Sequence, residues 1–350
     1  MIKALFICKQ GDNYSQPTTT IYNKKFSGLY NSASMVVDML NNTGIEATLE
    51  IAVDNNCIDR IVTEHKPSHV FIEAYWVVPE KFYVLTRLHP TVKWIVRVHS
   101  EIPFWATEGM AVDWTLEYLE YPHVYIAPNS ITTYNDINTI LHTKYGHTHQ
   151  NRVVYLPNYY PVGVQKPYKK IERTTDELHI GCFGAIRPLK NQLVQAIAAI
   201  RYANIKDKTL YFHINSSRVE GNGGPVLKNI RKLFESATRH KLVEHAWMPH
   251  EEFLNLIESM DLGMQVSFTE SFNIVAANFV TVGKPIVVSS EIDWVAKRFY
   301  AHPTHSIDIM KALYRAEALG NLGVYLNRYL LESYSERSSE YWIDYLTYQG

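Results

Sequence analysis

The chain has 350 residues, of which 46% are apolar and 20% are charged, and its formal net charge is −1. This length predicts two domains of roughly 150 to 200 residues each, and the composition excludes a disordered or fibrous protein. Residues 1–150 hold 11 Lys and Arg against 15 Asp and Glu, whereas residues 151–350 hold 23 against 20. Neither half has the basic excess that sequence-independent binding to nucleic acid needs, and the second half is the better place for an anion.

The cysteines and the apolar runs of the sequence indicate the cellular compartment of the protein. Cys8, Cys57 and Cys182 lie far apart and match no metal-binding spacing, which predicts unpaired thiols in a reducing compartment. The N-terminal run MIKALFICKQ is too short for a signal peptide, and no stretch approaches the ~18 apolar residues of a membrane helix. We therefore expect a cytoplasmic protein without a membrane span.

Apolar runs that predict strands alternate with helical patterns in the first half of the chain. Strands are expected at 3–8, 46–53, 69–77, 93–100, 124–130 and 153–158, with helices at 31–44, 57–65, 79–89, 112–121 and 134–146. Alternation of this kind predicts a parallel sheet with helices on both faces. The connection after the first strand is long and rich in hydroxyl groups, and long ordered loops are often functional.

A polar, aperiodic segment at 164–178 predicts a linker, after which the alternation restarts. Strands are expected at 179–186, 210–215, 242–247, 262–267 and 285–290, with helices at 191–204, 226–240, 250–260 and 273–283. The fold class is therefore α/β, with two doubly wound Rossmann-like domains at 1–163 and 179–334 that face a central cleft. The tail is helical from about residue 322, and its last part, about 335–350, is expected to join the first domain.

The segment SFTESFNIVAANFVTVGKPIVVSS, residues 267–290, joins a buried strand to a helix through a turn that contains Glu270. Helix N-termini at the end of such strands bind phosphate groups. Glu270 is a candidate for hydrogen bonds to sugar hydroxyls, and Ser271, Phe272 and Asn273 are candidates for presenting backbone amides to an anion. The alternative is an ordinary helix start in which Thr269 or Ser271 is the N-cap.

This segment resembles the C-terminal signature of retaining B-type (two-Rossmann, family-4-like) glycosyltransferases, in which Ser-x-x-Glu-x-Phe-Gly, a helix and Gly-x-Pro-Val-Val follow one another. The matching residues are Ser267, Glu270, Phe272, Asn273, Gly283, Pro285, Val287 and Val288. The resemblance implies that Glu270 lies beside the donor sugar and that residues 271–274, which end at Ile274, hold the donor phosphates. Asn278 replaces the second acid of the family motif, and its amide can bind ribose hydroxyls but carries no charge.

Other segments extend the resemblance. In GCFGAIRPLKNQ, it implies that Gly184 allows close backbone approach and that Arg187 and Lys190 hold the donor diphosphate; the alternative is solvated loop charges. It also implies that His99, at the end of KWIVRVHS, faces the donor sugar, although a lone His in that position is more often structural. Gly28, near the start of the first helix, matches the glycine-bearing loop that similar enzymes bring against the diphosphate.

The resemblance implies a glycosyltransferase that moves a sugar from a nucleotide-diphosphate donor to an acceptor hydroxyl with retention. No Asp-x-Asp occurs, so no metal or other cofactor is expected. The first half is similar to glycosyltransferases encoded by large tailed phages, which makes a hydroxymethylated pyrimidine in DNA one acceptor hypothesis and the host cytoplasm the location; the acidic first half disfavours that acceptor. The alternative function is a catalytically silent, two-lobed protein that binds sugar nucleotides or glycans.

Overall fold

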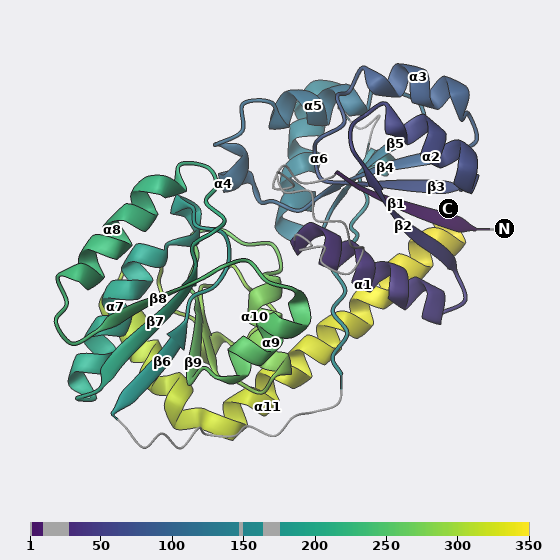
Figure 1. Cartoon of the computed structure of the whole chain (residues 1–350). Coiled ribbons are helices and arrows are strands. Elements are labelled where there is room, and N and C mark those ends of the chain that lie inside the picture. The colour runs from purple at the N-terminus through teal and green to yellow at the C-terminus, as the bar shows by residue number, and fades with distance from the viewer. Residues whose placement is uncertain (1, 10–27, 147–149, 164–175, 350) are drawn as a thin grey trace, which may run out of the picture. The chain divides into compact units, whose positions relative to one another are not determined.

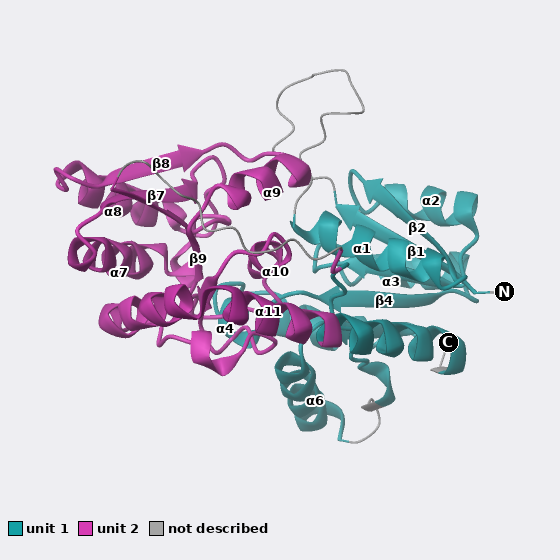
Figure 2. Ribbon diagram, turned by 90° about the horizontal axis from the view of Figure 1, so that it is seen from below, with its two compact units in different colours: residues 1–22, 26–161, 334–350 teal, residues 23–25, 162–333 magenta. Residues whose placement is uncertain are grey.

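The computed structural model describes residues 2–9, 28–146, 150–163 and 176–349. The chain divides into two compact units, which Figure 2 distinguishes by colour. Unit 1 contains the N-terminal strand, residues 26–161 and residues 334–350, and unit 2 contains residues 162–333. The loop at 10–27 and most of the predicted linker, residues 164–175, lie outside the described residues.

Unit 1 is built on a parallel sheet with the strand order β2-β1-β3-β4-β5. Its strands are β1 (Lys3–Lys9), β2 (Glu46–Ala52), β3 (His69–Glu73), β4 (Lys93–Val98) and β5 (Val124–Pro128). Its helices are α1 (Gly28–Asn42), α2 (Cys57–His65), α3 (Lys81–Leu88), α4 (Ile102–Trp105), α5 (Ala111–Tyr118) and α6 (Ile131–Tyr145) (Figure 1). Parallel strands need crossover connections, and the helices supply them.

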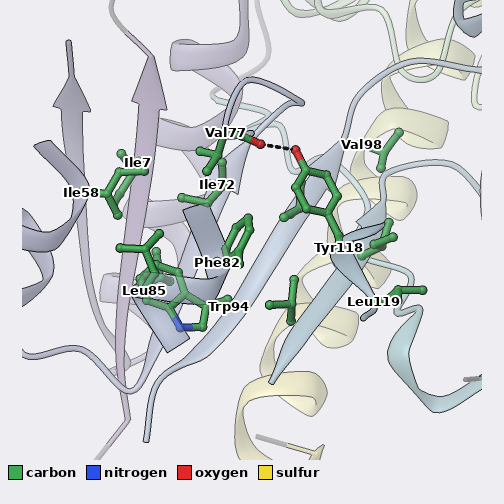
Figure 3. Packing of buried hydrophobic residues seen from close by; sticks show 14 of the residues in the cluster. Ile7, Ile58, Ile72, Val77, Phe82, Leu85, Trp94, Val98, Tyr118 and Leu119 are labelled. Carbon is green, nitrogen blue, oxygen red and sulfur yellow. Dashed lines mark hydrogen bonds between the residues drawn. The ribbon is translucent and has the colours of Figure 1, made fainter. Parts of the chain in front are cut away.

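One face of this sheet packs against a large hydrophobic cluster, part of which is shown in Figure 3. Ile7 of β1 and Trp94 of β4 point into it, because alternate residues of a strand face the same side. Phe82 of α3 and Tyr118 of α5 cover them, and the Tyr118 hydroxyl donates a hydrogen bond to the Val77 carbonyl. The buried hydroxyl is thus satisfied, as buried polar groups usually are.

The opposite face of the unit 1 sheet packs against α1 and against the end of the C-terminal helix. Phe6 of β1 stacks on Phe71 with ring centroids 4.5 Å apart, and Trp342 lies 5.6 Å from Phe6 and 5.2 Å from Phe71. The Trp342 indole N–H donates to the Pro157 carbonyl at 2.8 Å. The last turns of the chain are therefore part of the core of unit 1.

Unit 2 repeats the plan with a parallel sheet of order β10-β9-β6-β7-β8. Its strands are β6 (Glu177–Gly181), β7 (Thr209–Asn215), β8 (Lys241–His245), β9 (Leu262–Gln265) and β10 (Ile286–Val288). Its helices are α7 (Gln192–Ile205), α8 (Gly223–Glu235), α9 (His250–Glu258) and α10 (Ile274–Thr281), followed by the long α11 (Ser306–Asp344) that passes into unit 1. The carboxyl ends of β6 and its neighbour β9 lie on one edge, which places the loops after them close together.

The predicted fold class is confirmed, since both halves form parallel sheets flanked by helices. Two details of the prediction are wrong. The run 69–77 ends as a strand at Glu73, where Ala74 turns the chain at φ 71°. The run 153–158 forms a single bridge from Val153 to β5 rather than a sixth strand. The range of α11 contains two helices that meet at a kink at Gly320, with φ 43°, and the second of them matches the helical tail predicted from about residue 322.

The first turn of α8 gives a stability prediction for unit 2. A Cβ on Gly223 would lie 1.9 Å from the Ile186 carbonyl oxygen, a backbone atom, whereas a Cβ on Gly224 would meet nothing within 4 Å. Gly223→Ala should therefore lower the free energy of unfolding by about 3 kcal/mol or more, because the backbone must shift to admit the methyl group. Gly224→Ala is the matched control and should change it by less than about 1 kcal/mol. Denaturant unfolding of both variants measures the difference, and equal midpoints would contradict the prediction.

Candidate functional site

The turn between β9 and α10 contains Glu270 and ends in a cap that the sequence did not predict. Asn273 is the N-cap of α10, with φ 63°, and its Oδ1 accepts a hydrogen bond from the Ala276 amide at 2.9 Å. Its Nδ2 donates to Gln265 at 2.9 Å. The alternative of Thr269 or Ser271 as N-cap is therefore wrong, and Glu270 lies in the loop ahead of the helix rather than in its first turn.

Phe272 anchors this loop to the body of unit 2. Its side chain is buried beside Trp294, with ring centroids 5.7 Å apart, and its carbonyl accepts a hydrogen bond from the Trp294 indole at 2.8 Å. Ser271 precedes this anchor and Ile274 opens the helix. The residues predicted to hold donor phosphates thus belong to a turn whose position is fixed on both sides, at the end of a helix whose dipole favours an anion.

Lys190 and Glu270 form an ion pair, although 80 residues of sequence separate them. Their side chains are 14% and 7% exposed, so neither is an ordinary solvated charge. The Phe268 amide donates to the Leu189 carbonyl at 2.9 Å and joins the two loops at this point. The structure therefore brings together two of the predicted catalytic residues at the carboxyl edge of the unit 2 sheet.

The loop from Gly184 to Lys190 is held by side chains of the following helix. Gln195 donates to the Lys190 carbonyl, and Gln192 donates to the Ala185 carbonyl, both at 2.9 Å. Gly184 has φ 115°, a conformation that favours glycine, and its amide donates to Asn215 Oδ1 at 3.0 Å. Because these contacts fix the backbone, Lys190 occupies one position before any ligand arrives.

Arg187 occupies the same loop and lies beside a different acid. Its Nη1 lies 3.8 Å from Glu220 Oε2, and a quarter of its side chain is exposed. This contact is longer and more exposed than the pair of Lys190 and Glu270.

Two hydroxyl groups beside Glu270 have no hydrogen-bond partner among the described residues. They are Ser267 Oγ and Thr269 Oγ1, and both residues are buried. A buried polar group without a partner costs ~1–3 kcal/mol, so such groups in native structures call for an explanation. Their place in the turn that carries Glu270 makes them candidate contacts for a polar ligand.

Asn278, at the position of the family's second acid, is 2% exposed and lies within α10. Its Oδ1 is 2.9 Å from Nε2 of His250, the first residue of α9. Since the amide oxygen is an acceptor, Nε2 of His250 carries the proton. His250 could not be predicted as a partner of Asn278, because nothing in its local sequence indicates that α9 and α10 meet at this point.

In unit 1, His99 belongs to a buried cluster of three charged or titratable side chains. Arg97 and Glu73 lie opposite each other on β4 and β3 and are 0% and 1% exposed. Arg97 Nη1 donates to both Glu73 carboxylate oxygens at 3.2 Å, and His99 Nε2 lies 2.6 Å from Glu73 Oε2. Arg97 is thus a paired buried cation. Glu73 was not predicted at all.

Further contacts hold Arg97 on its other side. Its Nη2 donates to the Leu156 carbonyl at 3.2 Å and to Asn158 Oδ1 at 3.3 Å, and its guanidinium carbon lies 4.8 Å from the Trp342 ring centroid. Both acceptors belong to the segment that was predicted as a sixth strand. The cation is therefore fixed by a carboxylate, two oxygen acceptors and an aromatic face.

The charges of this cluster set one another's pKa values. Burial alone would raise the pKa of Glu73, but the charges of Arg97 and His99 outweigh it and hold that pKa below its ordinary value. Burial and the nearby guanidinium lower the pKa of His99, against the opposing pull of Glu73. At neutral pH the cluster therefore holds an ionised Glu73 and a neutral His99, whose Nε2–H donates to the carboxylate and whose Nδ1 is an acceptor.

Gly28, a predicted site residue, and Glu101 lie elsewhere in unit 1. Gly28 is the first residue of α1, but the loop before it lies outside the described residues, so its predicted contact with the diphosphate stays a prediction. Glu101, just beyond His99, accepts a hydrogen bond from Thr133 of α6 at 2.9 Å. Within the described part of the chain, no three His, Cys, Asp or Glu lie where they could share a metal ion, and no helix is long and apolar enough to cross a membrane.

Comparisons with known proteins find no matching family model and no matching curated protein sequence. Solved structures do match. The N-terminal domain of trehalose-6-phosphate phosphatase from Candida albicans superposes with a TM-score of 0.70 and 10% identity, covering 99% of this chain and 97% of that one. A UDP-forming α,α-trehalose-phosphate synthase from Burkholderia vietnamiensis gives 0.66 and 11%, covering 99% and 97%. HepE from Anabaena in complex with UDP gives 0.61 and 12%, covering 99% and 100%. At this level of identity the likeness establishes the fold, and the chain has the two-Rossmann GT-B fold that it shares with UDP-forming glycosyltransferases.

Proposed function

We propose that the protein is a retaining glycosyltransferase that moves a sugar from a nucleoside diphosphate donor to an acceptor hydroxyl. The observation that carries the proposal is the largely shielded ion pair of Lys190 and Glu270, with side chains 14% and 7% exposed, at the carboxyl edge of the unit 2 sheet. Open α/β sheets bind ligands at that edge. The GT-B fold supports the same conclusion, and UDP sugars are the donors to test first because one similar structure contains UDP.

In the proposed reaction the bond between the anomeric carbon and the β-phosphate oxygen breaks, and a bond to the acceptor oxygen forms on the same face. The acceptor proton passes to the departing phosphate, so no enzymic nucleophile is needed. Arg187 and Lys190 neutralise the charge that develops on the leaving group, a task for cations that are in place before the transition state. Glu270 accepts hydrogen bonds from the sugar, Ser271 to Ile274 hold the phosphates, and His99 is assigned to the donor sugar.

Donor hydrolysis tests the proposal without knowledge of the acceptor. Incubated with a panel of UDP, GDP, ADP and TDP sugars, the protein should slowly release nucleoside diphosphate from one of them, with water as acceptor. Glu270→Ala should lower that rate by on the order of 100-fold. Glu235→Ala, which changes an exposed acid of the same unit, is the matched control and should leave the rate unchanged. No release from any donor, with donor binding unaffected by Glu270→Ala, would sink the proposal.

The competing function is a protein of the same fold that binds a sugar nucleotide without turning it over. Asn278 is the observation that favours it, since a neutral amide stands where the family has a carboxylate. Calorimetric binding separates the two functions. A donor that binds with micromolar affinity and stays intact over hours would support the silent protein, whereas slow release of nucleoside diphosphate supports the enzyme.

The acceptor is the remaining part of the proposal. A hydroxymethylated pyrimidine would have to be flipped out of the duplex to reach a sugar donor. Mass spectrometry of nucleosides from modified and unmodified DNA, after incubation with mixed donors, tests this acceptor directly, and a lack of mass gain removes it. A cytoplasmic location, in a host cell if the gene is carried by a phage, stays part of the proposal and rests on Cys8, Cys57 and Cys182, which form no disulfide.

A further inference from the structure

The cluster in unit 1 contains an acid that the proposed reaction has not yet used. Glu73 is the last residue of β3, the central strand of its sheet, and its side chain is fully buried. The next residue, Ala74, has φ 71°, a conformation that costs energy for any residue with a side chain. A buried carboxylate followed by a strained turn, at the edge of the sheet where ligands bind, indicates a position built for function.

The carboxylate of Glu73 has two hydrogen-bonding partners, Arg97 and His99. Both oxygens accept from Arg97 Nη1 at 3.2 Å, while Oε2 also accepts the much shorter bond, 2.6 Å, from His99 Nε2. A buried guanidinium needs a counter-ion, but that counter-ion does not also have to bond to a histidine. The shorter contact is therefore the one that a purely structural ion pair leaves unexplained.

Holding Nε2–H on a carboxylate has two chemical effects on an imidazole. It fixes the plane of the ring, and it fixes the tautomer, so that Nδ1 is an acceptor. Arg97 acts in the opposite direction on charge, because a cation beside the ring opposes its protonation. Cys8, the other titratable group that faces Glu73, has its thiol pKa raised by burial and stays neutral.

We propose that Glu73 is the positioning residue for His99, and that the carboxylate fixes the orientation and tautomer in which the imidazole meets the donor sugar. This inference rests on the proposed function, because it assumes that His99 contacts the donor. Arg97 has a separate part: it keeps Glu73 ionised and opposes the protonation of His99. Both partners thus act on the site through His99 rather than by touching the substrate.

The opposite signs of the two partners supply the test. Long-range ¹⁵N–¹H spectra of the histidine rings, with the His99 signals assigned by their loss in His99→Asn, give its titration midpoint. Glu73→Gln should lower that midpoint by about one unit, because the carboxylate no longer stabilises the imidazolium. Arg97→Gln should raise it by about one unit, because the opposing cation is gone. Glu64→Gln, which changes an exposed acid of unit 1, should leave it unchanged.

The same variants are then assayed for donor hydrolysis as a function of pH. The acid limb is the pH range in which kcat/KM falls as the pH is lowered. It should shift to lower pH in Glu73→Gln and to higher pH in Arg97→Gln. A merely structural role of Glu73 and Arg97 would not produce opposite shifts. Midpoints or limbs that stay at the wild-type values would overturn the proposal. If Glu73→Gln does not fold, the comparison of Arg97→Gln with the double variant carries the test, because adding Glu73→Gln to Arg97→Gln should lower the midpoint and the acid limb relative to Arg97→Gln alone.

Failure of this inference and failure of the proposed function give different results. A wild-type protein that releases no nucleoside diphosphate from any donor contradicts the proposed function, and the midpoints then decide alone whether Glu73 governs His99. A wild-type protein that turns over a donor, with an acid limb that ignores both substitutions, supports the function and overturns the role of Glu73.

Discussion

Lys190→Met should reduce the release of nucleoside diphosphate by about 100- to 1,000-fold while leaving the fold intact. The substitution keeps the length of the side chain but removes the fixed cation that faces Glu270. If Lys190 neutralises the leaving group, its charge matters most when the bond to the phosphate breaks, so kcat should fall more than donor affinity. Steady-state kinetics with calorimetric donor binding separate the two effects.

A double-mutant cycle sharpens this expectation. Because Lys190 and Glu270 contact each other, the loss from Lys190→Met and Glu270→Gln together should be clearly smaller than the product of the two single losses. Lys232→Met removes an exposed lysine of the same unit and should change neither kcat nor binding. A Lys190→Met protein that keeps its activity within threefold would exclude Lys190 from the transition state and leave the ion pair a structural role.

Glu73→Ala should lower the free energy of unfolding by about 3–5 kcal/mol, the largest stability loss expected in unit 1. The substitution leaves the Arg97 guanidinium fully buried without its carboxylate, and an uncompensated buried charge is far costlier than a lost surface pair. Thermal unfolding followed by circular dichroism should show a midpoint lower by about 10 °C, at ~2–4 °C for each kcal/mol.

The double variant Glu73→Leu with Arg97→Met distinguishes the charge effect from a packing defect. Removing both charges together should recover most of the lost stability, because well-packed apolar residues often replace a buried ion pair at little cost. Glu64→Ala breaks an exposed pair with Arg60 and should change the stability by less than about 1 kcal/mol. A double variant as unstable as Glu73→Ala would mean that the stability loss comes from the change in side-chain volume rather than from the unpaired charge.

Much of the fold could be predicted because strands of a two-sided parallel sheet are continuous apolar runs. KALFIC and HVFIE are such runs, and both are buried strands. The run VVYLPN has the same composition, and its Val154 and Leu156 amides donate to β5 carbonyls, but it forms only one bridge and its Leu156 carbonyl and Asn158 side chain bond to Arg97. The helical tail was predictable from about residue 322 because Gly320, with φ 43°, breaks the helix just before it.

The candidate site was predictable where neighbours in sequence carry the motif, and not where distant segments meet. Glu270 and Lys190 belong to separate sequence motifs. Their ion pair depends on β6 and β9 being adjacent strands, which the order of the strands in the sequence does not reveal. Glu73 was missed for the same reason. It stands out only when β3 and β4 are aligned so that Glu73 lies opposite Arg97.

The long helix α11 has a consequence for the order in which the protein is completed during synthesis. Trp342, which covers Phe6, Phe71 and Arg97 in unit 1, follows the whole of unit 2 in the chain. The ribosome therefore synthesises every strand of the unit 1 sheet long before it adds Trp342, which covers part of one face of that sheet. Unit 2 can fold as an uninterrupted stretch of translated chain, whereas the buried cation beside His99 gains its aromatic cover only after all of unit 2 has been translated.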